Sequence, residues 1–204
     1  MAVKYGWPPP FNCDAKTLRT QKYYVRKVTQ DMSVESVLDV GTGLKGVGAE
    51  HYWNVSKHIK QGYAIDIWSN PKAGGRWKPI KDDVFNIRKY LDKVDVIQAF
   101  GFLEHLGKKQ GYCFLELAED LAQKLVMVSV AHWVLIGNNM GMRITCDKGP
   151  MLFALNYKKH GNPYHTYKSS WSWLEFQQLG YETNIEDAFN GTSFSDEVIA
   201  WKRL

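Results

Sequence analysis

The residues with the clearest chemical potential are one carboxylate and three glycines within a short stretch, Asp39, Gly41, Gly43 and Gly46. Glycines let the backbone turn tightly and approach a ligand closely. The stretch lies between a predicted strand and a predicted helix, and the amides at a helix N-terminus favour negative charge. The spacing G-x-G-x-x-G also matches a dinucleotide-binding turn, so by itself it does not choose the ligand.

Three acidic residues narrow that choice. Asp39 lies two residues before the first glycine, where a carboxylate would repel a pyrophosphate but would suit a ligand with cationic groups. Asp66 ends the next apolar run and can accept hydrogen bonds from ribose hydroxyls, as it could for NAD or for another nucleoside. Asp83 follows a third short run and can accept from an adenine amino group. Each acid could instead be an ordinary cap or turn residue, but their joint position at successive strand ends favours a ligand site.

The elements that must position these residues form an alternating pattern. Apolar, β-branched runs alternate with amphipathic stretches, which predicts a doubly wound α/β sheet. The expected strands are residues 34–40, 61–67, 77–81, 94–100, 125–131, 181–185 and 197–202. The expected helices are residues 17–30, 47–58, 84–91, 108–123 and 169–179, the last with an N-cap at Ser169 or Ser170 and a stop at Gly180.

The chain is expected to divide into an N-terminal arm and helix, residues 1–33, and one ligand-binding domain, residues 34–204. Residues 132–168 interrupt the alternation with glycines, prolines and asparagines. A loop-rich stretch of this length inside a compact domain is usually functional. We therefore expect this insertion to cover the substrate side of the site.

Composition excludes several classes of protein. The 204 residues are 45% hydrophobic and 23% charged, which fits one α/β domain. No apolar run reaches the length of a membrane span, and residues 1–11 lack the apolar core of a secretory signal, so we expect a cytoplasmic protein. The three cysteines and six histidines lack metal-ligand spacing, which predicts reduced thiols and no metal site. The net charge of +5 is modest, and its densest cluster, residues 16–27, is expected to be a solvated helix face.

The motifs resemble those of class I S-adenosylmethionine-dependent methyltransferases. The resemblance is carried by residues 37–43 (VLDVGTG), 63–67 (YAIDI), 83–84 (DV) and 95–106 (DVIQAFGFLEHL). Residues 161–165, 170–171 and 179–182 resemble the closing part of one branch of these enzymes. It extends from Val34 to the C-terminus. It implies a Rossmann-like fold, a seven-stranded and mostly parallel sheet with helices on both faces and an antiparallel last strand. The chain departs from the family at Lys45, where a glycine is frequent, and the glycine follows one place later at Gly46.

The resemblance implies that the cofactor is S-adenosylmethionine and the product S-adenosylhomocysteine. It also implies a role for each matching residue. The methionine end would be held by Asp39, Gly41, Thr42 and Gly43, the ribose by Asp66, the adenine face by Ile67, the adenine edge by Asp83 and Val84, and the methionine pocket would be lined by the backbone of Phe100.

Methyl transfer from a sulfonium needs mainly alignment and exclusion of water, with a base where the acceptor must lose a proton. The candidate bases are His105, just past the fourth strand, and His165, in the insertion. We expect a small-molecule acceptor methylated at oxygen or nitrogen. RNA or protein methylation stays open, although the motif after the fourth strand reads Gln98-Ala99-Phe100-Gly101 rather than Asn-Pro-Pro-Tyr. A nicotinamide-dependent reductase is disfavoured by Asp39, and a non-catalytic partner subunit stays open. The oligomeric state is not specified.

Overall fold

The structure is a computed structural model of the whole chain. It describes residues 15–42, 53, 59–69, 76–131, 134–137, 140–143, 164, 168–169, 171–185 and 197–204.

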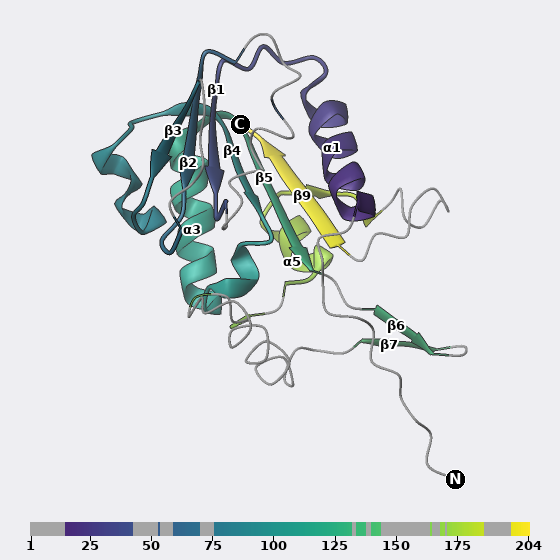
Figure 1. Cartoon of the computed structure of the whole chain (residues 1–204). Helices are drawn as coiled ribbons and strands as arrows, with labels where there is room; N and C mark the ends of the chain where they lie inside the picture. Colours follow the sequence, from purple (N-terminus) through teal and green to yellow (C-terminus); the bar gives the residue numbers. More distant parts are fainter. Residues whose placement is uncertain are drawn as a thin grey trace.

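A seven-stranded sheet forms the centre of the molecule, with the strand order β3-β2-β1-β4-β5-β9-β8 (Figure 1). Its strands are β1 (Ser36–Val40), β2 (Gln61–Ile65), β3 (Trp77–Ile80), β4 (Val94–Phe100), β5 (Ala122–Ala131), β8 (Glu182–Thr183) and β9 (Glu197–Arg203). Strands β1 to β5 pair in parallel, whereas β9 pairs antiparallel with β5 and with β8. This arrangement confirms the predicted mostly parallel sheet with an antiparallel last strand.

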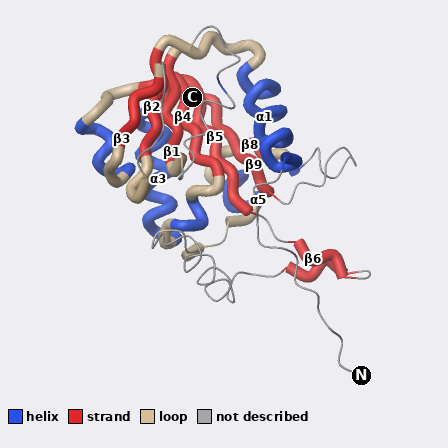
Figure 2. The backbone as a smooth tube through the Cα atoms, viewed as in Figure 1, coloured by secondary structure: helices blue, strands red, loops and turns tan. Residues whose placement is uncertain are grey.

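Helices cover both faces of the sheet (Figure 2). The helical elements are α1 (Ala15–Thr29), α3 (Lys108–Leu121) and α5 (Trp173–Gln178), with the 3-10 helices η1 (Val84–Lys89) and η2 (Leu103–His105). Helix α1 packs Tyr24, Val25 and Val28 on one face, against β4, β5 and β9. Helices α3 and α5 pack Phe114 and Phe176 on the other. Alternate residues of each strand therefore belong to different cores.

This alternation decides which polar side chains share a face. Val37 of β1, Val96 of β4, Leu125 and Met127 of β5, and Ile199 of β9 all belong to the α1 side. Side chains two residues further along each strand point to the same side. Asp39, Gln98, Ser129 and Glu197 consequently all lie on the α1 face, near the carboxyl ends of β1, β4 and β5. Asp39 is opposite Gln98, whereas Ser129 and Glu197 lie further toward the end of β5.

The predicted boundaries are confirmed for the fourth strand and shift elsewhere. Strand β2 ends at Ile65 rather than residue 67, because Asp66 begins a turn. Strand β5 begins at Ala122, immediately after α3 ends at Leu121. The short helix predicted over residues 84–91 is present as a 3-10 helix over Val84–Lys89. Of the predicted helix 47–58, the structure describes Trp53, which is helical and buried.

The predicted N-cap at Ser169 or Ser170 is wrong. Helix α5 begins at Trp173, and Ser172 caps it by accepting from the amide of Glu175, whose carboxylate accepts in return from the Ser172 amide. This is a capping box. The Ser169 hydroxyl instead donates to the Leu103 carbonyl, at 3.2 Å. The stop is confirmed, because α5 ends at Gln178 with Leu179 as its C-cap, and Gly180 follows with a φ of 82°.

The insertion contains an element that the pattern did not predict. Strands β6 (Val134–Gly137) and β7 (Met140–Arg143) pair antiparallel as a hairpin separate from the main sheet. The hairpin projects beyond the end of β5 (Figure 1). The expected irregular character of residues 132–168 is therefore incorrect for this part.

Candidate functional site

The candidate residues gather where neighbouring parallel strands end. Asp39 is the penultimate residue of β1, Asp66 directly follows β2, and Phe100 is the last residue of β4. Val40 pairs with Ile65, and Asp39 pairs with Gln98. Because these strands run in parallel, the tips of β1, β2 and β4 lie together at one edge of the sheet. In open α/β sheets, ligands bind outside the carboxyl ends of the strands.

The turn after β1 depends on Gly41. Its φ is 71°, and its amide donates to the Ile65 carbonyl at 2.9 Å. A Cβ atom at this position would lie 2.7 Å from Cδ2 of Phe102, so the turn has no room for a side chain. The next side chain, Thr42, has a buried hydroxyl without a hydrogen-bond partner among the described residues. Gly43 and Gly46 lie outside the described residues.

Asp39 is held by a chain of polar side chains inside the α1 face. The carboxylate is 3% exposed and accepts from Nε2 of Gln98 at 3.0 Å. Oε1 of Gln98 in turn accepts from Nε1 of Trp53 at 2.9 Å. This fixes the orientation of Asp39 at the strand tip. Sequence reasoning missed Gln98 and Trp53, although a glutamine within the apolar run VDVIQAF was a signal for a buried polar partner.

Asp66 orders the turn after β2. Its Oδ1 accepts from the amides of Trp68 and Ser69 at 2.8 and 2.7 Å. The following side chains, Ile67 and Trp68, are more than a third exposed. The Trp68 ring lies 6.4 Å from the ring of Tyr164, between centroids. The end of the insertion therefore meets the tip of β2.

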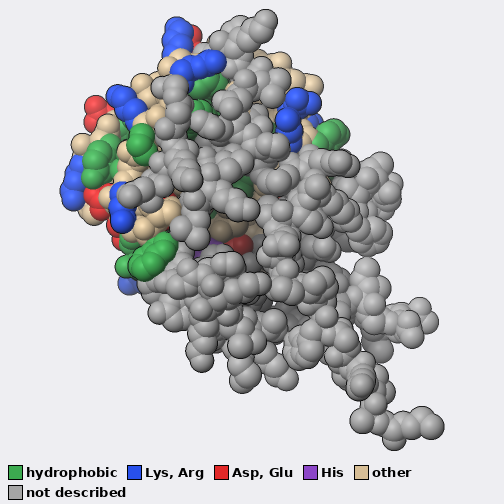
Figure 3. Space-filling view, in the orientation of Figure 1, with side chains coloured by type: hydrophobic (Ala, Val, Ile, Leu, Met, Phe, Trp, Pro, Cys, Tyr) green, Lys and Arg blue, Asp and Glu red, His purple; other side chains and the backbone are tan. Residues whose placement is uncertain are grey.

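The adenine-edge candidates have structural roles of their own. Asp83 caps η1 by accepting from the Phe85 amide at 3.0 Å, and Val84 is buried in the core. The neighbouring Asp82 accepts from Nδ2 of Asn86 and from the Tyr90 hydroxyl, both at 2.9 Å. These hydrogen bonds hold the pKa of Asp82 below its ordinary value. On the side of the molecule formed by β2, β3 and η1, exposed hydrophobic side chains lie among charged ones (Figure 3).

A second glycine turn follows β4. Gly101 has a φ of 62°, and its amide donates to the Ser129 carbonyl at 3.0 Å and to the Ser129 hydroxyl at 3.2 Å. Phe100, the preceding residue, pairs with Ser129 in the sheet. Sequence reasoning named Phe100 but missed Gly101 and Ser129. The turn after β4 is therefore attached to β5 as well as to its own strand.

His105 lies at the end of η2, immediately beyond this turn. Its amide donates to the Phe102 carbonyl at 3.0 Å, and the residue is partly buried. The adjacent Glu104 carbonyl accepts from the amides of Lys168 and Ser169, at 2.7 and 3.3 Å. The chain thus returns from the insertion to the body beside His105. His165, the other candidate base, lies outside the described residues.

A further buried polar cluster, which the sequence did not indicate, lies beside the turn after β4. We call it the Glu197 cluster, and it consists of Gln21 in α1, Ser129 in β5 and Glu197 in β9. Oε1 of Glu197 accepts from Nε2 of Gln21 at 2.6 Å and from the Ser129 hydroxyl. Burial of the carboxyl raises the pKa of Glu197 to about 7, although the two hydrogen bonds act in the opposite direction.

Metal-binding clusters and membrane-spanning helices are both absent from the described part of the chain. No group of three or more His, Cys, Asp or Glu side chains there is placed to hold a metal ion. Among the same residues, no helix has both the length and the apolar character of a membrane span.

Comparison with known proteins identifies the fold. No family model matches the chain, and no curated protein matches it in sequence. Among solved structures, it is similar to an S-adenosylmethionine-dependent methyltransferase from Archaeoglobus fulgidus, with a TM-score of 0.57 and 12% identity over 92% of this chain and 94% of that one. It is also similar to magnesium protoporphyrin IX methyltransferase from Synechocystis with bound S-adenosylhomocysteine, with a TM-score of 0.54 and 14% identity over 98% and 90%.

A third similar structure is an O-methyltransferase family protein from Burkholderia thailandensis, with a TM-score of 0.56 and 13% identity. The match covers 93% of this chain but spans only 60% of that protein's length. These likenesses show that the chain has the Rossmann-like methyltransferase fold. They confirm the predicted fold class.

Proposed function

We propose that this chain is an S-adenosylmethionine-dependent methyltransferase that methylates an oxygen or nitrogen of a small-molecule acceptor. One observation carries the proposal: Asp39 and Asp66 end neighbouring parallel strands on either side of a glycine turn with positive φ. The three similar structures named above support it through the fold. Because one fold hosts many reactions, the argument depends on the site.

The side chains at these strand tips fit a nucleoside that also carries cationic groups. Asp39, fixed by Gln98, supplies negative charge at the tip of β1, which would stabilise the ammonium group of the methionine end. Asp66 would accept from ribose hydroxyls, with Ile67 against the adenine face. The buried Thr42 hydroxyl, which has no hydrogen-bond partner within the described segments, offers a polar group to the methionine end. Asp83 and the backbone of Val84 would contact the adenine edge.

The cofactor, when bound, supplies a methyl group that is already activated on sulfur. The chain's own residues would hold the donor and acceptor in line and exclude water. His105 and His165 are the candidates for accepting a proton from the acceptor. We propose that the insertion, residues 132–168, covers the acceptor, because its end meets the body at Trp68 and at Glu104.

Two further features of the proposal concern the acceptor and the compartment. The similar enzyme from Synechocystis is described as acting on magnesium protoporphyrin IX, which is a small molecule. The proposed compartment is the cytoplasm, where thiols stay reduced; Cys113 is a free, exposed cysteine.

Calorimetry with S-adenosylmethionine, S-adenosylhomocysteine and NADH tests the proposal. We expect binding of the first two and none of NADH. Asp39→Asn keeps the size of the side chain but removes its charge, so it should weaken binding of S-adenosylhomocysteine by about tenfold or more, since hydrogen bonds to charged groups contribute about 1.5–3 kcal/mol. Asp92→Asn, which changes an exposed acid before β4, is the matched control and should bind normally. Absence of binding of both adenosyl ligands to the folded protein would refute the proposal.

A further inference from the structure

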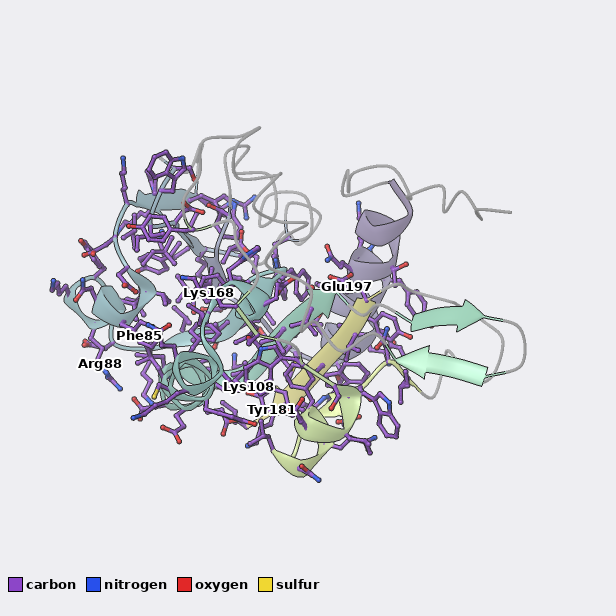
Figure 4. All side chains as sticks on the ribbon, turned by 90° about the horizontal axis from the view of Figure 1, so that it is seen from below. Phe85, Arg88, Lys108, Lys168, Tyr181 and Glu197 are labelled. Carbon is purple, nitrogen blue, oxygen red and sulfur yellow. The ribbon has the colours of Figure 1, made fainter. Side chains whose placement is uncertain are left out.

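The Glu197 cluster connects α1 and β9 to the tip of β4. Gln21 is 4% exposed and Ser129 is fully buried. The Oε2 atom of Glu197 is buried as well, although the residue as a whole is partly exposed. Glu197 lies at the start of β9, on the side that faces α1 (Figure 4). Three segments far apart in sequence thus meet around one carboxyl group.

Ser129 carries this connection onward to the turn after β4. Its hydroxyl donates to Oε1 of Glu197 and accepts from the Gly101 amide at 3.2 Å and from Nε2 of Gln21 at 3.3 Å. The hydroxyl has one proton to donate and two lone pairs to accept with. All three are used in this arrangement. The Gly101 amide divides its hydrogen bond between the Ser129 carbonyl, at 3.0 Å, and this hydroxyl. The hydroxyl part of that bond depends on which way the Ser129 hydroxyl points, and that direction depends on Glu197.

We propose that Glu197 is a positioning residue that acts through the Ser129 hydroxyl on the turn at Gly101, and so on the part of the cofactor site formed by the tip of β4. The role of that turn in binding rests on the proposed function. The connection itself, from Glu197 through Ser129 to Gly101, does not depend on it.

Glu197 acts on the turn at Gly101 through its protonation state. An ionised carboxylate accepts the Ser129 proton in a charge-assisted hydrogen bond, which is stronger than a neutral one. The lone pairs of Ser129 are then directed at Gly101 and Gln21. Protonation makes Glu197 a weaker acceptor and leaves the Ser129 hydroxyl less restrained. The bond from the Gly101 amide to that hydroxyl then weakens, while its bond to the Ser129 carbonyl stays, so the turn at Gly101 shifts toward the carbonyl. Because burial raises the pKa of Glu197 to about 7, this change falls near neutral pH.

Among the described residues of the Glu197 cluster, Glu197 is the ionisable one. From β5 it faces Ser129, and the next residue of β9 on the same side is the apolar Ile199. From α1 it faces Gln21, and the ionisable side chain one turn along is Tyr24, which stacks on Trp201 at 5.7 Å between centroids. A phenol ordinarily titrates near pH 10, well above this range.

The first test follows the Gly101 amide by NMR in the ligand-free protein, from about pH 5.5 to about pH 8.5, on either side of the pKa of about 7. We expect its chemical shift to titrate together with the Glu197 side chain. In Ser129→Ala, Glu197 should still titrate but Gly101 should no longer follow. In Glu197→Gln, neither should titrate. Histidines also titrate near neutral pH, so these two variants separate the effect of Glu197 from theirs.

The second test measures the affinity for S-adenosylhomocysteine over the same pH range. Wild-type affinity should fall about fivefold to tenfold from the upper to the lower end, a coupling of ordinary size. By linkage, the ligand should lower the pKa of Glu197. Glu197→Gln and Ser129→Ala should show a flat profile. Glu116→Gln, which removes an exposed carboxyl from α3, should retain the wild-type profile.

Two outcomes would overturn the inference. One is a Gly101 amide that does not follow the titration of Glu197 in the wild type. The other is a Ser129→Ala protein that keeps the pH dependence. If the Gly101 amide titrates as expected but the folded protein binds S-adenosylhomocysteine at no pH, the connection through Ser129 stands and the proposed function fails.

Discussion

The two glycine turns at the site differ in the space available for a side chain, and substitution by alanine tests this difference. Gly41 and Gly101 both have positive φ, at 71° and 62°. A Cβ at Gly41 would collide with Phe102, whereas a Cβ at Gly101 would meet only Oε1 of Glu104, at an ordinary 3.9 Å. An L-residue with positive φ costs about 1–2 kcal/mol, and overpacking adds about 1–3 kcal/mol.

We therefore predict that Gly41→Ala lowers the free energy of unfolding more than Gly101→Ala does. The expected costs are about 2–5 kcal/mol for Gly41→Ala and about 1–2 kcal/mol for Gly101→Ala. Urea denaturation followed by circular dichroism measures both. Equal losses in the two variants would show that Phe102 moves aside without cost, contrary to the prediction.

At the same scale, single residues show how far the sequence could predict the site. Asp39, Asp66 and Gly41 were recognisable because each lies at or just beyond the end of an apolar run, which is a local pattern. Gln98 and Ser129 were not assigned to the site, because their importance comes from the strands beside them. The Glu197 cluster was out of reach of local reasoning, since Gln21 and Glu197 are separated by 176 residues in sequence.

The helical elements are anchored on one another as well as on the sheet. Lys108, at the start of α3, forms an ion pair with Glu175 of α5 at 2.6 Å and lies 3.7 Å above the ring centre of Trp171. The same Glu175 completes the capping box with Ser172. Helix α5 has only six residues, too few to be stable alone. Its cap and its contacts with α3 therefore determine whether it forms.

Removal of the cap tests this dependence. Ser172→Ala removes the oxygen that accepts from the Glu175 amide, and we predict a loss of about 1 kcal/mol in the free energy of unfolding. Ser172→Thr keeps a hydroxyl and should lose clearly less. Chemical denaturation of both variants measures their free energies of unfolding. A similar loss in the two would indicate that size at this buried position matters more than the cap.

Elements were predictable from the sequence where one physical signal dominated. Strand β4 was predicted at its observed bounds because a mostly apolar run, VDVIQAF, begins after Lys93 and ends before Gly101. The start of α5 was misplaced because three nearby serines could each have capped the helix. These are Ser169, Ser170 and Ser172. Ser172 is the cap because Glu175, three residues later, completes a capping box with it. The hairpin of β6 and β7 lacked such a signal, since its strands have four residues each.

On the scale of the whole molecule, the strand order places the candidate site residues at one edge of the sheet. The tips of β1, β2 and β4 share an edge because these strands run in parallel and the chain crosses from β3 back to β4 beside β1. A second crossing, from β5 to β8, leaves the place beside β5 for β9. The alternation of strands and helices predicted a parallel sheet. The motifs that resemble methyltransferases predicted the Rossmann-like form of that sheet. Neither the pairing of α1 with β9 nor the contact between Tyr164 and Trp68 follows from that pattern, because both depend on how the finished layers pack.

A ligand held by several strand tips must stabilise the whole fold, since those tips separate when the chain unfolds. At a concentration of one hundred times its dissociation constant, a ligand that binds only the native state adds about 2.7 kcal/mol to the free energy of unfolding. For a chain of 204 residues, each kcal/mol raises Tm by about 2–4 °C. We predict that S-adenosylhomocysteine raises Tm by about 5–10 °C, that NADH leaves it unchanged, and that Asp39→Asn greatly reduces the shift at the same ligand concentration. Differential scanning calorimetry measures all three; a shift of equal size in Asp39→Asn would mean that the ligand is held elsewhere than between the tips of β1 and β2.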